Sequence, residues 1–377
     1  MSSLALYRKY RPKTLRDLLG QDDVVTVLRA AASRDSLAHA YLFYGSRGSG
    51  KTTAARILAK IANCETRRQK PSFRAEGEPC NVCGQCVVID TGRSLDVVEI
   101  DAASNRGIDE IRNLKESVAF APVSGAKKVF IIDEVHQLTK DAFNALLKTL
   151  EEPPAHALFV LATTEYEKVP ATIISRTQRF HFKKIPMATV VRKLATIVSA
   201  EKFKVSREAL MLIARAGEGS LRDSESLLDQ LTSLEDKVEA ITVERLIGTV
   251  GLARVSELAD LILSENVTGV SHYLRNFEDS GFNVVDLNKE LIHYLRRVLS
   301  VAADASLLDL FRDEFGEDAI ATIKTHAAKI RPERHISLIR SLIRAHSEMR
   351  YSPFAGIPLE VSLIDFFSSG SSPRVKK

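Results

Sequence analysis

The sequence predicts an α/β fold in which a parallel, doubly wound sheet is followed by regions that are helical throughout. Up to residue 182, short apolar runs alternate with helical patterns, as they do in successive βαβ units. Most of these runs are continuously apolar, which is typical of strands whose two faces are both covered. After residues 184–186 (Lys-Ile-Pro) only helical periodicity remains, so we expect no further strands there.

The expected strands and helices follow in order along the chain. The strands are expected over Ala40–Tyr44, Val97–Asp101, Lys128–Asp133, Leu158–Ala162 and Arg179–Phe182. Helices among them are expected over Lys51–Asn63, Ile108–Val118 and Lys140–Leu150. The resulting domain boundaries are 1–182 for the α/β domain, with a cysteine module at 64–86, then 183–248 and 249–367 for two helical domains. The Gly/Ser-rich, basic segment 368–377 is expected to be a disordered tail.

Composition and charge narrow the class of protein. A chain of 377 residues exceeds one ordinary core, and 45% apolar with 27% charged residues is typical of globular proteins. No apolar run is long enough to cross a membrane and the start lacks a signal-peptide core, so we expect a cytoplasmic protein with no membrane partner. The net charge of +5 permits a polyanionic partner without requiring one. A basic cluster near the start fits a solvated face or a nucleotide or nucleic-acid contact equally well: Arg8, Lys9, Arg11 and Lys13.

The segment Gly45–Thr52 has the P-loop pattern G-x-x-x-x-G-K-[ST] between an apolar strand and a helix. Its glycines let backbone N–H groups turn around a phosphate, and the following helix adds its positive end. Lys51 would reach the β- and γ-phosphates, and the Thr52 hydroxyl would bind Mg²⁺. A Gly/Ser turn that merely links strand and helix is the alternative, and it is disfavoured by an eight-residue match in this context. The expected nucleotide contacts are Gly45, Gly48, Ser49, Gly50, Lys51, Thr52 and Thr53.

The run Val129–Ile132 ends in two acids, Asp133 and Glu134. At the carboxyl end of a central strand, Asp133 would lie beside the P-loop and hold Mg²⁺ directly or through water. Glu134 would project toward the γ-phosphate and polarise the attacking water. An Asp-Glu pair that caps the next helix is the alternative, and the P-loop upstream makes it the weaker interpretation.

Three further polar positions narrow the function. Thr163 and Thr164 end another strand, where a hydroxyl could position water or sense the γ-phosphate. Arg176 could bond within its own domain or reach the nucleotide of a neighbouring subunit as an arginine finger. Arg222 begins a helix, and for it the sequence alone favours an ion pair with a nearby acid such as Glu225.

All four cysteines lie in one stretch with the spacing C-x₁₅-C-x₂-C-x₂-C: Cys64, Cys80, Cys83 and Cys86. Four thiolates are the ligand set of a closed tetrahedral Zn²⁺ site, which would be structural rather than catalytic. Disulfides would not persist in a cytosolic protein, and a [4Fe–4S] cluster or free thiols are the remaining alternatives. The basic segment 65–70 between them is expected to be an exposed loop.

Taken together, these residues resemble the gamma/tau subunits of bacterial DNA polymerase III, the AAA+ ATPases of sliding-clamp loaders. The resemblance covers essentially the whole chain, and Phe143–Pro154 is more specific than any single NTPase motif. The other segments that carry it are Tyr7–Pro12, the P-loop, the four cysteines, Asp133–His136, Leu161–Glu165, Ser175-Arg176 and Gly219–Asp223. Two departures are Thr177, where the family usually has Cys, and a stretch between Cys64 and Cys80 that looks longer than usual.

The resemblance implies roles for these residues. Lys51 and Thr52 correspond to Walker A, Asp133 and Glu134 to Walker B, Thr163 or Thr164 to sensor 1, Arg176 to the finger that acts in trans, and Arg222 to sensor 2. Tyr7, Arg11 and Pro12 correspond to contacts with the nucleotide base and ribose. It further implies that residues 183–248 form a lid and 249–367 an oligomerisation collar, with ATP, Mg²⁺ and structural Zn²⁺ as cofactors.

The implied function is the ATPase motor of a clamp loader, acting in a pentamer with delta and delta-prime type subunits. Its other implied partners are the sliding clamp and primer–template DNA, the latter contacted through phosphates at helix starts such as 105–107 and 139–140. Two alternatives stay open: a scaffold subunit that binds nucleotide with little turnover, and a related AAA+ branch-migration motor.

Overall fold

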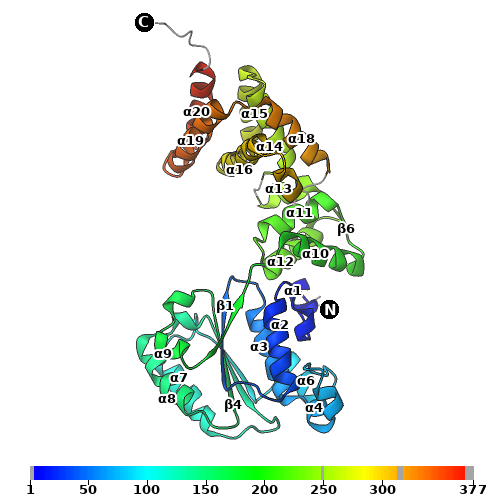
Figure 1. Cartoon of the computed structure of the whole chain (residues 1–377), viewed down its shortest axis with the longest axis vertical. Coiled ribbons are helices and arrows are strands. Elements are labelled where there is room, and N and C mark those ends of the chain that lie inside the picture. The colour runs from blue at the N-terminus through cyan, green and yellow to red at the C-terminus, as the bar shows by residue number, and fades with distance from the viewer. Residues whose placement is uncertain (1–3, 248–249, 312–316, 370–377) are drawn as a thin grey trace. The chain divides into compact units, whose positions relative to one another are not determined.

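The computed structural model describes residues 4–247, 250–311 and 317–369 (Figure 1). The chain divides into two compact units, one formed by residues 1–193 with 217–229 and the other by residues 194–216 with 230–377. Most of the predicted tail, from residue 370 onward, lies outside the described residues. The three-domain boundaries predicted from the sequence stay a prediction.

The first unit is built on a five-stranded sheet of order β2-β3-β4-β1-β5, in which every pair of neighbours is parallel. The strands are β1 (Ala40–Gly45), β2 (Val97–Asp101), β3 (Lys128–Asp133), β4 (Ala157–Thr163) and β5 (Gln178–Phe182). This confirms the predicted parallel α/β fold. In the paired register Asp101 lies beside Asp133 and Tyr44 beside Thr163, so the polar ends of four strands meet at one edge of the sheet.

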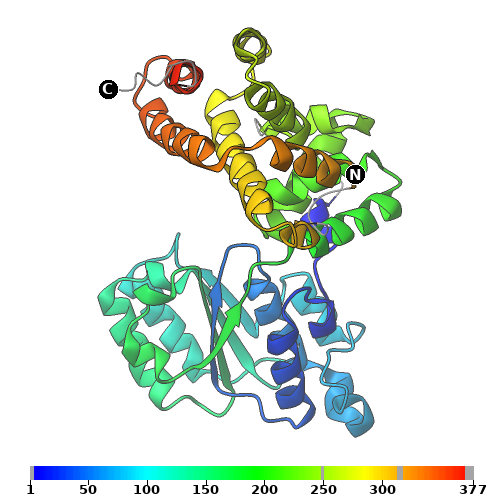
Figure 2. The same ribbon diagram turned by 45° about the horizontal axis from the view of Figure 1, so that its top comes forward.

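Helices cover both faces of this sheet (Figure 2). On one face lie α2 (Asp22–Ser33) and α3 (Lys51–Asn63), whose buried apolar side chains share a core with β1, β3 and β4. On the other face lie α7 (Ile108–Ala119), α8 (Lys140–Glu151) and the short α9 (Ala171–Ile174). Short elements before and between them are α1 (Leu6–Lys9) and the 3₁₀ helices η1 (Leu15–Asp17), η2 (Val135–Gln137) and η3 (Tyr166–Lys168).

The cysteine module follows α3 and contains α4 (Glu65–Gln69), α5 (Pro71–Arg74) and α6 (Gly84–Asp90). The expectation of an exposed loop over 65–70 is therefore wrong in part, because most of the segment is helical and only Arg68, Gln69 and Lys70 are exposed. The reason is Arg67, whose side chain is buried because its guanidinium donates to the carbonyl groups of Ala32 (2.7 Å) and Arg74 (3.1 Å). Basic side chains usually indicate exposure, but here carbonyl acceptors satisfy the donors of Arg67 inside the fold.

The second unit is mostly helical. It contains α11 (Arg207–Ala216), α13 (Ala240–Ile247), α14 (Leu252–Leu263), α15 (Val267–Asp279), α16 (Val284–Ala303), α17 (Leu307–Phe311), α18 (Glu317–Lys329), α19 (Pro332–Met349) and α20 (Gly356–Ser369). Helices α10 (Met187–Glu201) and α12 (Leu221–Leu234) give residues to both units. On α16, Leu291, Leu295 and Val298 recur at helical spacing and are fully buried in the core of this unit.

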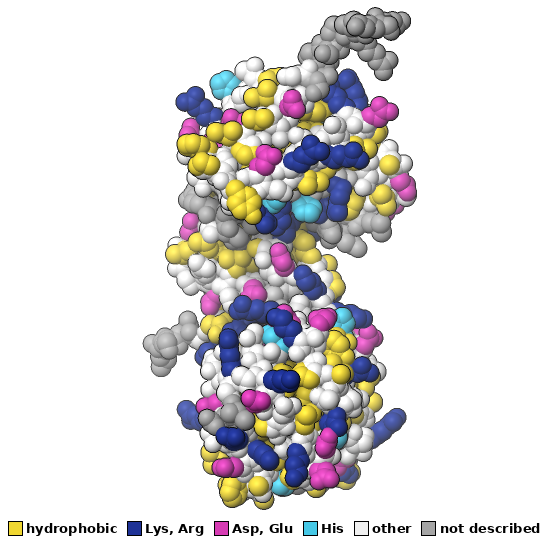
Figure 3. All heavy atoms as spheres, turned by 90° about the vertical axis from the view of Figure 1, so that its left-hand side faces the viewer, with side chains coloured by type: hydrophobic (Ala, Val, Ile, Leu, Met, Phe, Trp, Pro, Cys, Tyr) yellow, Lys and Arg dark blue, Asp and Glu magenta, His cyan; other side chains and the backbone are white. Residues whose placement is uncertain are grey.

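One expectation for this region is wrong, because two short strands accompany the helices. Strands β6 (Lys204–Val205) and β7 (Lys237–Val238) pair in parallel. Strands of two residues are too short to show a period of two in the sequence. Among the described residues, no helix is long and apolar enough to cross a membrane. On the face drawn in Figure 3, basic and acidic side chains are interspersed, in keeping with the net charge of +5.

Candidate nucleotide-binding site

A cavity of about 450 Å³ lies within the first unit, at the carboxyl edge of the sheet. The P-loop, the N-terminal segment, the end of β3 and the start of α12 all contribute to its lining. Twelve residues predicted from the sequence line it: Tyr7, Arg11, Pro12, Gly48, Ser49, Gly50, Lys51, Thr52, Thr53, Asp133, Glu134 and Arg222. The structure therefore gathers most of the predicted site in one place. Four predicted residues lie outside this lining: Gly45, Thr163, Thr164 and Arg176.

The P-loop needs its glycines for their backbone shape. Gly45, Gly48 and Gly50 have φ angles of 141°, 69° and 105°, a region that other residues rarely adopt. A Cβ on Gly45 would also lie 2.0 Å from the carbonyl oxygen of Phe182. Lys51 opens α3 and is buried; its Nζ donates to the carbonyl groups of Gly45 (2.9 Å) and Ser46 (2.8 Å). Burial lowers the pKa of Lys51, although nearby carboxylates oppose the shift.

The oxygen atoms expected to bind Mg²⁺ lie together. The Thr52 hydroxyl donates to Oδ2 of Asp133 at 2.7 Å, which joins the first turn of α3 to the end of β3. A hydroxyl and a carboxylate side by side are hard oxygen donors, the kind that Mg²⁺ prefers. The donor set therefore fits the ion that the sequence predicted.

Glu134 follows Asp133 but is held by the neighbouring strand. Its backbone is left-handed, with φ 47° and ψ 45°, a strained conformation for a residue other than glycine. Its Oε2 accepts hydrogen bonds from the backbone N–H (3.1 Å) and the hydroxyl (2.8 Å) of Thr164. Glu134 also lines the cavity. Its hydrogen bonds to Thr164 therefore connect a cavity residue at the end of β3 to the end of β4.

The two threonines proposed for one role have different surroundings. The Thr163 hydroxyl is fully buried, lies 2.9 Å from Nδ1 of His136 and accepts from the N–H of Glu165 at 3.0 Å. Thr164 is the residue of the pair that contacts Glu134. The structure therefore brings Thr164 into contact with Glu134, the predicted catalytic acid, whereas Thr163 contacts His136 and Glu165 instead.

Arg176 bonds within its own unit. Its guanidinium donates to the Thr172 carbonyl (2.7 Å) and the Ser175 hydroxyl (3.2 Å), and it also pairs with Glu151. Thr177, where a cysteine was expected, donates its hydroxyl to the carbonyl groups of Ile173 and Ile174, so the turn is closed without a thiol. The role of Arg176 in a neighbouring site stays a prediction.

Arg222 does not pair with Glu225. Its guanidinium lies over the ring of Tyr7, 5.3 Å from the ring centroid, and the described residues include no ion pair between Arg222 and Glu225. A hydrogen bond from Arg8 to the Tyr7 hydroxyl lowers the pKa of Tyr7, with the charge of Arg222 adding to the effect. The simplest explanation of Arg222 from the sequence is therefore wrong.

Five charged residues of the cavity lining were not predicted as site residues: Asp17, Arg47, Asp101, Lys193 and Glu225. Glu225 could have been found, because it lies three positions after Arg222 and so shares its helix face. Lys193 had no comparable signal, since nothing in the pattern of α10 separates it from a solvated lysine.

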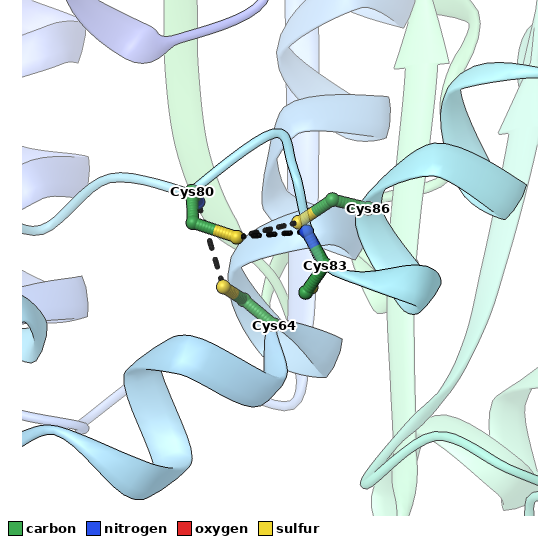
Figure 4. A group of neighbouring side chains, drawn as sticks. All are labelled: Cys64, Cys80, Cys83 and Cys86. Atoms are coloured by element: carbon green, nitrogen blue, oxygen red, sulfur yellow. Dashed lines mark hydrogen bonds between the residues drawn. The ribbon is translucent and has the colours of Figure 1, made fainter.

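The four cysteines converge in the module beside α3 (Figure 4). Their sulfur atoms all lie within 4.8 Å of one another, and ligand sulfurs around one tetrahedral Zn²⁺ would be about 3.8 Å apart. Cys64 and Cys86 are buried, and backbone N–H groups of Cys80 and Cys83 point at sulfur atoms of the cluster. A hydrogen bond from Cys86 lowers the pKa of Cys64, which favours a thiolate there. The cluster is therefore compatible with a metal site.

Three features define the class of protein. A parallel sheet carries a P-loop after its inner strand β1, an acidic pair follows β3 on the other side of β4, and an arginine of α12 lines the same cavity. The class is that of the AAA+ P-loop nucleotide-binding proteins. Family models match three successive segments: 20–186 matches "DNA polymerase III, delta subunit", 189–234 the clamp loader subunit ATPase lid domain, and 238–377 domain III of subunits gamma and tau. The chain belongs to the gamma/tau family of DNA polymerase III subunits.

Curated relatives agree along nearly the whole chain. The tau subunit of Bacillus subtilis is 40% identical over 365 residues, which cover 97% of this chain and 63% of that protein. The tau subunit of Escherichia coli is 38% identical over 368 residues, covering 97% and 55%. The chain thus spans 55% to 63% of the length of these relatives. A solved Thermotoga maritima RuvB branch migration motor is 17% identical with a TM-score of 0.45, covering 67% of this chain and 79% of that one, and nothing follows from an overlap of this size.

Proposed function

We propose that this chain is the ATPase subunit of a clamp loader, which couples ATP binding and hydrolysis to the loading of a sliding clamp on primer–template DNA. The observation that carries the proposal is the cavity, where the P-loop, the Thr52–Asp133 pair and Arg222 meet in a chain of the gamma/tau family. A scaffold without turnover would not need this set, and no observation favours it over the ATPase.

Different residues of the cavity bind the phosphates, bind Mg²⁺ and act in hydrolysis of ATP. Backbone N–H groups of the P-loop bind the phosphates, and Lys51 exchanges its two carbonyl partners for phosphate oxygens. Thr52 and Asp133 hold Mg²⁺, which neutralises charge on the phosphates. Glu134, positioned by Thr164, takes the proton of the attacking water. Arg222 and Tyr7, which also line the cavity, contact the nucleotide as well.

Assembly completes the site in this proposal. Arg176 exchanges its contact with Glu151 for the nucleotide of a neighbouring subunit and stabilises the charge that develops on transfer. The neighbours are other clamp-loader subunits of delta and delta-prime type, and the assembly works in the cytoplasm. The helix starts at Gly107 and Thr139, which cap α7 and α8, offer N–H groups to DNA phosphates without reading sequence. Binding of the assembly to DNA that does not weaken with salt would contradict this contact.

The cysteine cluster holds Zn²⁺ in this proposal. All four positions of a tetrahedral ion would be filled by thiolates from Cys64, Cys80, Cys83 and Cys86, which leaves none for a reacting molecule. The ion is therefore structural, and it fixes the module to the end of α3. Metal analysis of the purified chain, expected to give one zinc per chain, checks this assignment.

The function is tested by ATPase assays on a clamp loader reconstituted with its partner subunits, clamp and primer–template DNA. The wild-type assembly should hydrolyse ATP, with stimulation by clamp and DNA. Glu134→Gln should bind ATP as tightly as the wild type but lose turnover by about 100-fold or more, because it removes the proton acceptor. Lys51→Ala should lose binding itself. Turnover in Glu134→Gln equal to that of the wild type would contradict the role proposed for Glu134.

A further inference from the structure

Glu225 is a buried carboxyl group that has no partner in the free protein. Its side chain lies on α12, is 5% exposed and lines the cavity. No described residue makes a hydrogen bond or an ion pair with its carboxylate. The carboxylate faces the cavity, so water hydrates it in the free protein, and a ligand that displaces this water has to supply a hydrogen-bond donor in its place.

The cations nearest to Glu225 do not supply that partner. Lys193 and Arg11 influence it through charge alone. The Lys193 ammonium is instead 3.4 Å from the Tyr10 carbonyl oxygen and lies over the Tyr10 ring. Desolvation outweighs both cations and raises the pKa of Glu225 to about 7. The carboxyl group therefore keeps an unmet demand for a hydrogen-bond donor.

The chemistry of a nucleoside triphosphate decides which part of it can meet this demand. Phosphate oxygens are acceptors with negative charge, and they would be repelled by the ionised form of Glu225, which predominates above pH 7. In the proposed function they are bound by the P-loop and Lys51, which line another part of the cavity wall. The donors of ATP are the exocyclic amine of adenine and the hydroxyl groups of ribose, and all of them belong to the nucleoside.

We propose that Glu225 accepts a hydrogen bond from the nucleoside part of bound ATP, through the adenine amine or a ribose hydroxyl, and so determines nucleotide specificity. The inference rests on the proposed function, since it requires the cavity to be the ATP site. It adds a charged acceptor for the nucleoside to a site in which Tyr7, Arg11 and Pro12 are the other expected nucleoside contacts.

The test measures nucleotide affinity of the full chain by titration calorimetry with Mg²⁺ present. The ligands are ATP, purine riboside 5′-triphosphate (which lacks only the amine), 2′-deoxyATP and 3′-deoxyATP. The wild type should bind one of the three analogues about 10-fold more weakly than ATP, and that analogue identifies the donor. Glu225→Leu should bind ATP about 10-fold more weakly and should no longer distinguish this analogue from ATP.

Two further variants make the result specific. Asp223→Asn removes one negative charge from the same helix at a position outside the cavity lining, and it should match the wild type with every ligand. Glu225→Gln keeps the shape and a weaker, uncharged acceptor, so it should reduce the discrimination in part. If Glu225→Leu does not fold, as judged by circular dichroism, Glu225→Gln carries the test alone.

The failures are distinguishable. Wild-type discrimination ratios in Glu225→Leu or Glu225→Gln would overturn the role of Glu225 and leave the proposed function intact. Equal affinity of the wild type for all four nucleotides would also overturn it. Wild-type ATP affinity in Lys51→Ala would instead show that ATP binds elsewhere, and the proposed function would fail together with this inference.

Discussion

At the scale of single residues, the burial of Glu225 has a measurable cost that depends on pH. Its pKa is about 7 in the folded chain and about 4.5 in the unfolded chain. The folded state therefore binds more protons between these values, and the free energy of unfolding falls as pH rises from about 4.5 to 7. Glu225→Gln removes this loss. In the absence of nucleotide it should be more stable than the wild type at pH 8, by at most about 3 kcal/mol.

The measurement is urea denaturation of both proteins at pH 5.5 and pH 8. The advantage of Glu225→Gln should be smaller at pH 5.5 than at pH 8 by about 2 kcal/mol, because at pH 5.5 the carboxyl group is protonated in the folded chain but already mostly ionised in the unfolded chain. Lys193 and Arg11 oppose the shift and keep it below the value that burial alone would give. The same difference at both pH values would show that the Glu225 carboxyl group titrates normally.

Thr164 supplies a second prediction at this scale. Its hydroxyl and N–H both bind Glu134, so Thr164→Val keeps one of the two contacts and loses the other. Turnover should fall by about 10-fold with ATP affinity unchanged, since a misplaced acid affects the chemical step. Thr164→Ser keeps the hydroxyl and should behave as the wild type. Faster turnover in Thr164→Val would mean that the contact restrains Glu134 instead of positioning it.

The contacts of residues that end a recognisable motif were easier to predict than side-chain directions and burial that depend on tertiary packing. Thr52 and Asp133 each end a recognisable pattern at the same sheet edge, so their meeting could be predicted. The direction of the Glu134 side chain could not, because it depends on the pairing of β3 with β4. The burial of Glu225 could not be predicted either, because it depends on how residues 217–229 pack within the first unit.

At the scale of elements, the cysteine module and the N-terminal segment of the cavity are joined. Glu78, which lies in the module and is buried, accepts from the N–H groups of Leu15 (2.7 Å) and Arg16 (3.1 Å). Lys60 of α3, also buried, donates to the Lys13 carbonyl (3.0 Å) and to Asn81 of the module (2.7 Å). The segment held in this way leads directly to the residues of the N-terminal segment that line the cavity.

Removal of the proposed metal should therefore change both the cysteine module and the cavity. A strong chelator should lower the melting temperature, expose residues 64–90 to proteolysis and weaken ATP binding several-fold, because the fixed module holds the N-terminal segment. Restoring Zn²⁺ should reverse all three effects. Cys83→Ser should resemble the stripped protein and respond little to the chelator. If the chelator leaves the melting temperature of the wild type and the proteolysis of residues 64–90 unchanged, the proposal of a structural metal is contradicted.

Elements with a long, consistent pattern were predicted almost to the residue, as for α3, β2 and β3. The failures are elements whose existence depends on distant partners. Helix α4 was missed because the buried contacts of Arg67 give a basic segment a reason to fold. Strands β6 and β7 exist only through each other, and each is too short to carry a pattern of its own.

At the scale of the whole molecule, the proposal that Arg176 acts on a neighbouring nucleotide can be tested with two inactive proteins. Lys51→Ala cannot bind phosphate, and Arg176→Ala cannot complete a neighbour. Clamp loaders assembled from either variant alone should show little ATPase activity, whereas loaders assembled from a mixture should regain part of it. The gain arises because some interfaces then combine an intact Lys51 with an intact Arg176. No recovery in the mixture would contradict a finger that acts between subunits.

The sheet also constrains how the protein can be made. Strand β1 (Ala40–Gly45) emerges from the ribosome early, but both of its hydrogen-bonded neighbours, β4 and β5, lie beyond residue 156. Until those strands are synthesised, the backbone of β1 has no partner in the sheet and the P-loop that follows it has no fixed base. Its apolar side chains then have to be shielded from aggregation for as long as the ribosome takes to reach β5. The pairing of β1 with two strands from much later in the chain, which holds the P-loop at the edge of the cavity in the finished protein, is thus also the reason why this candidate site is completed late during synthesis.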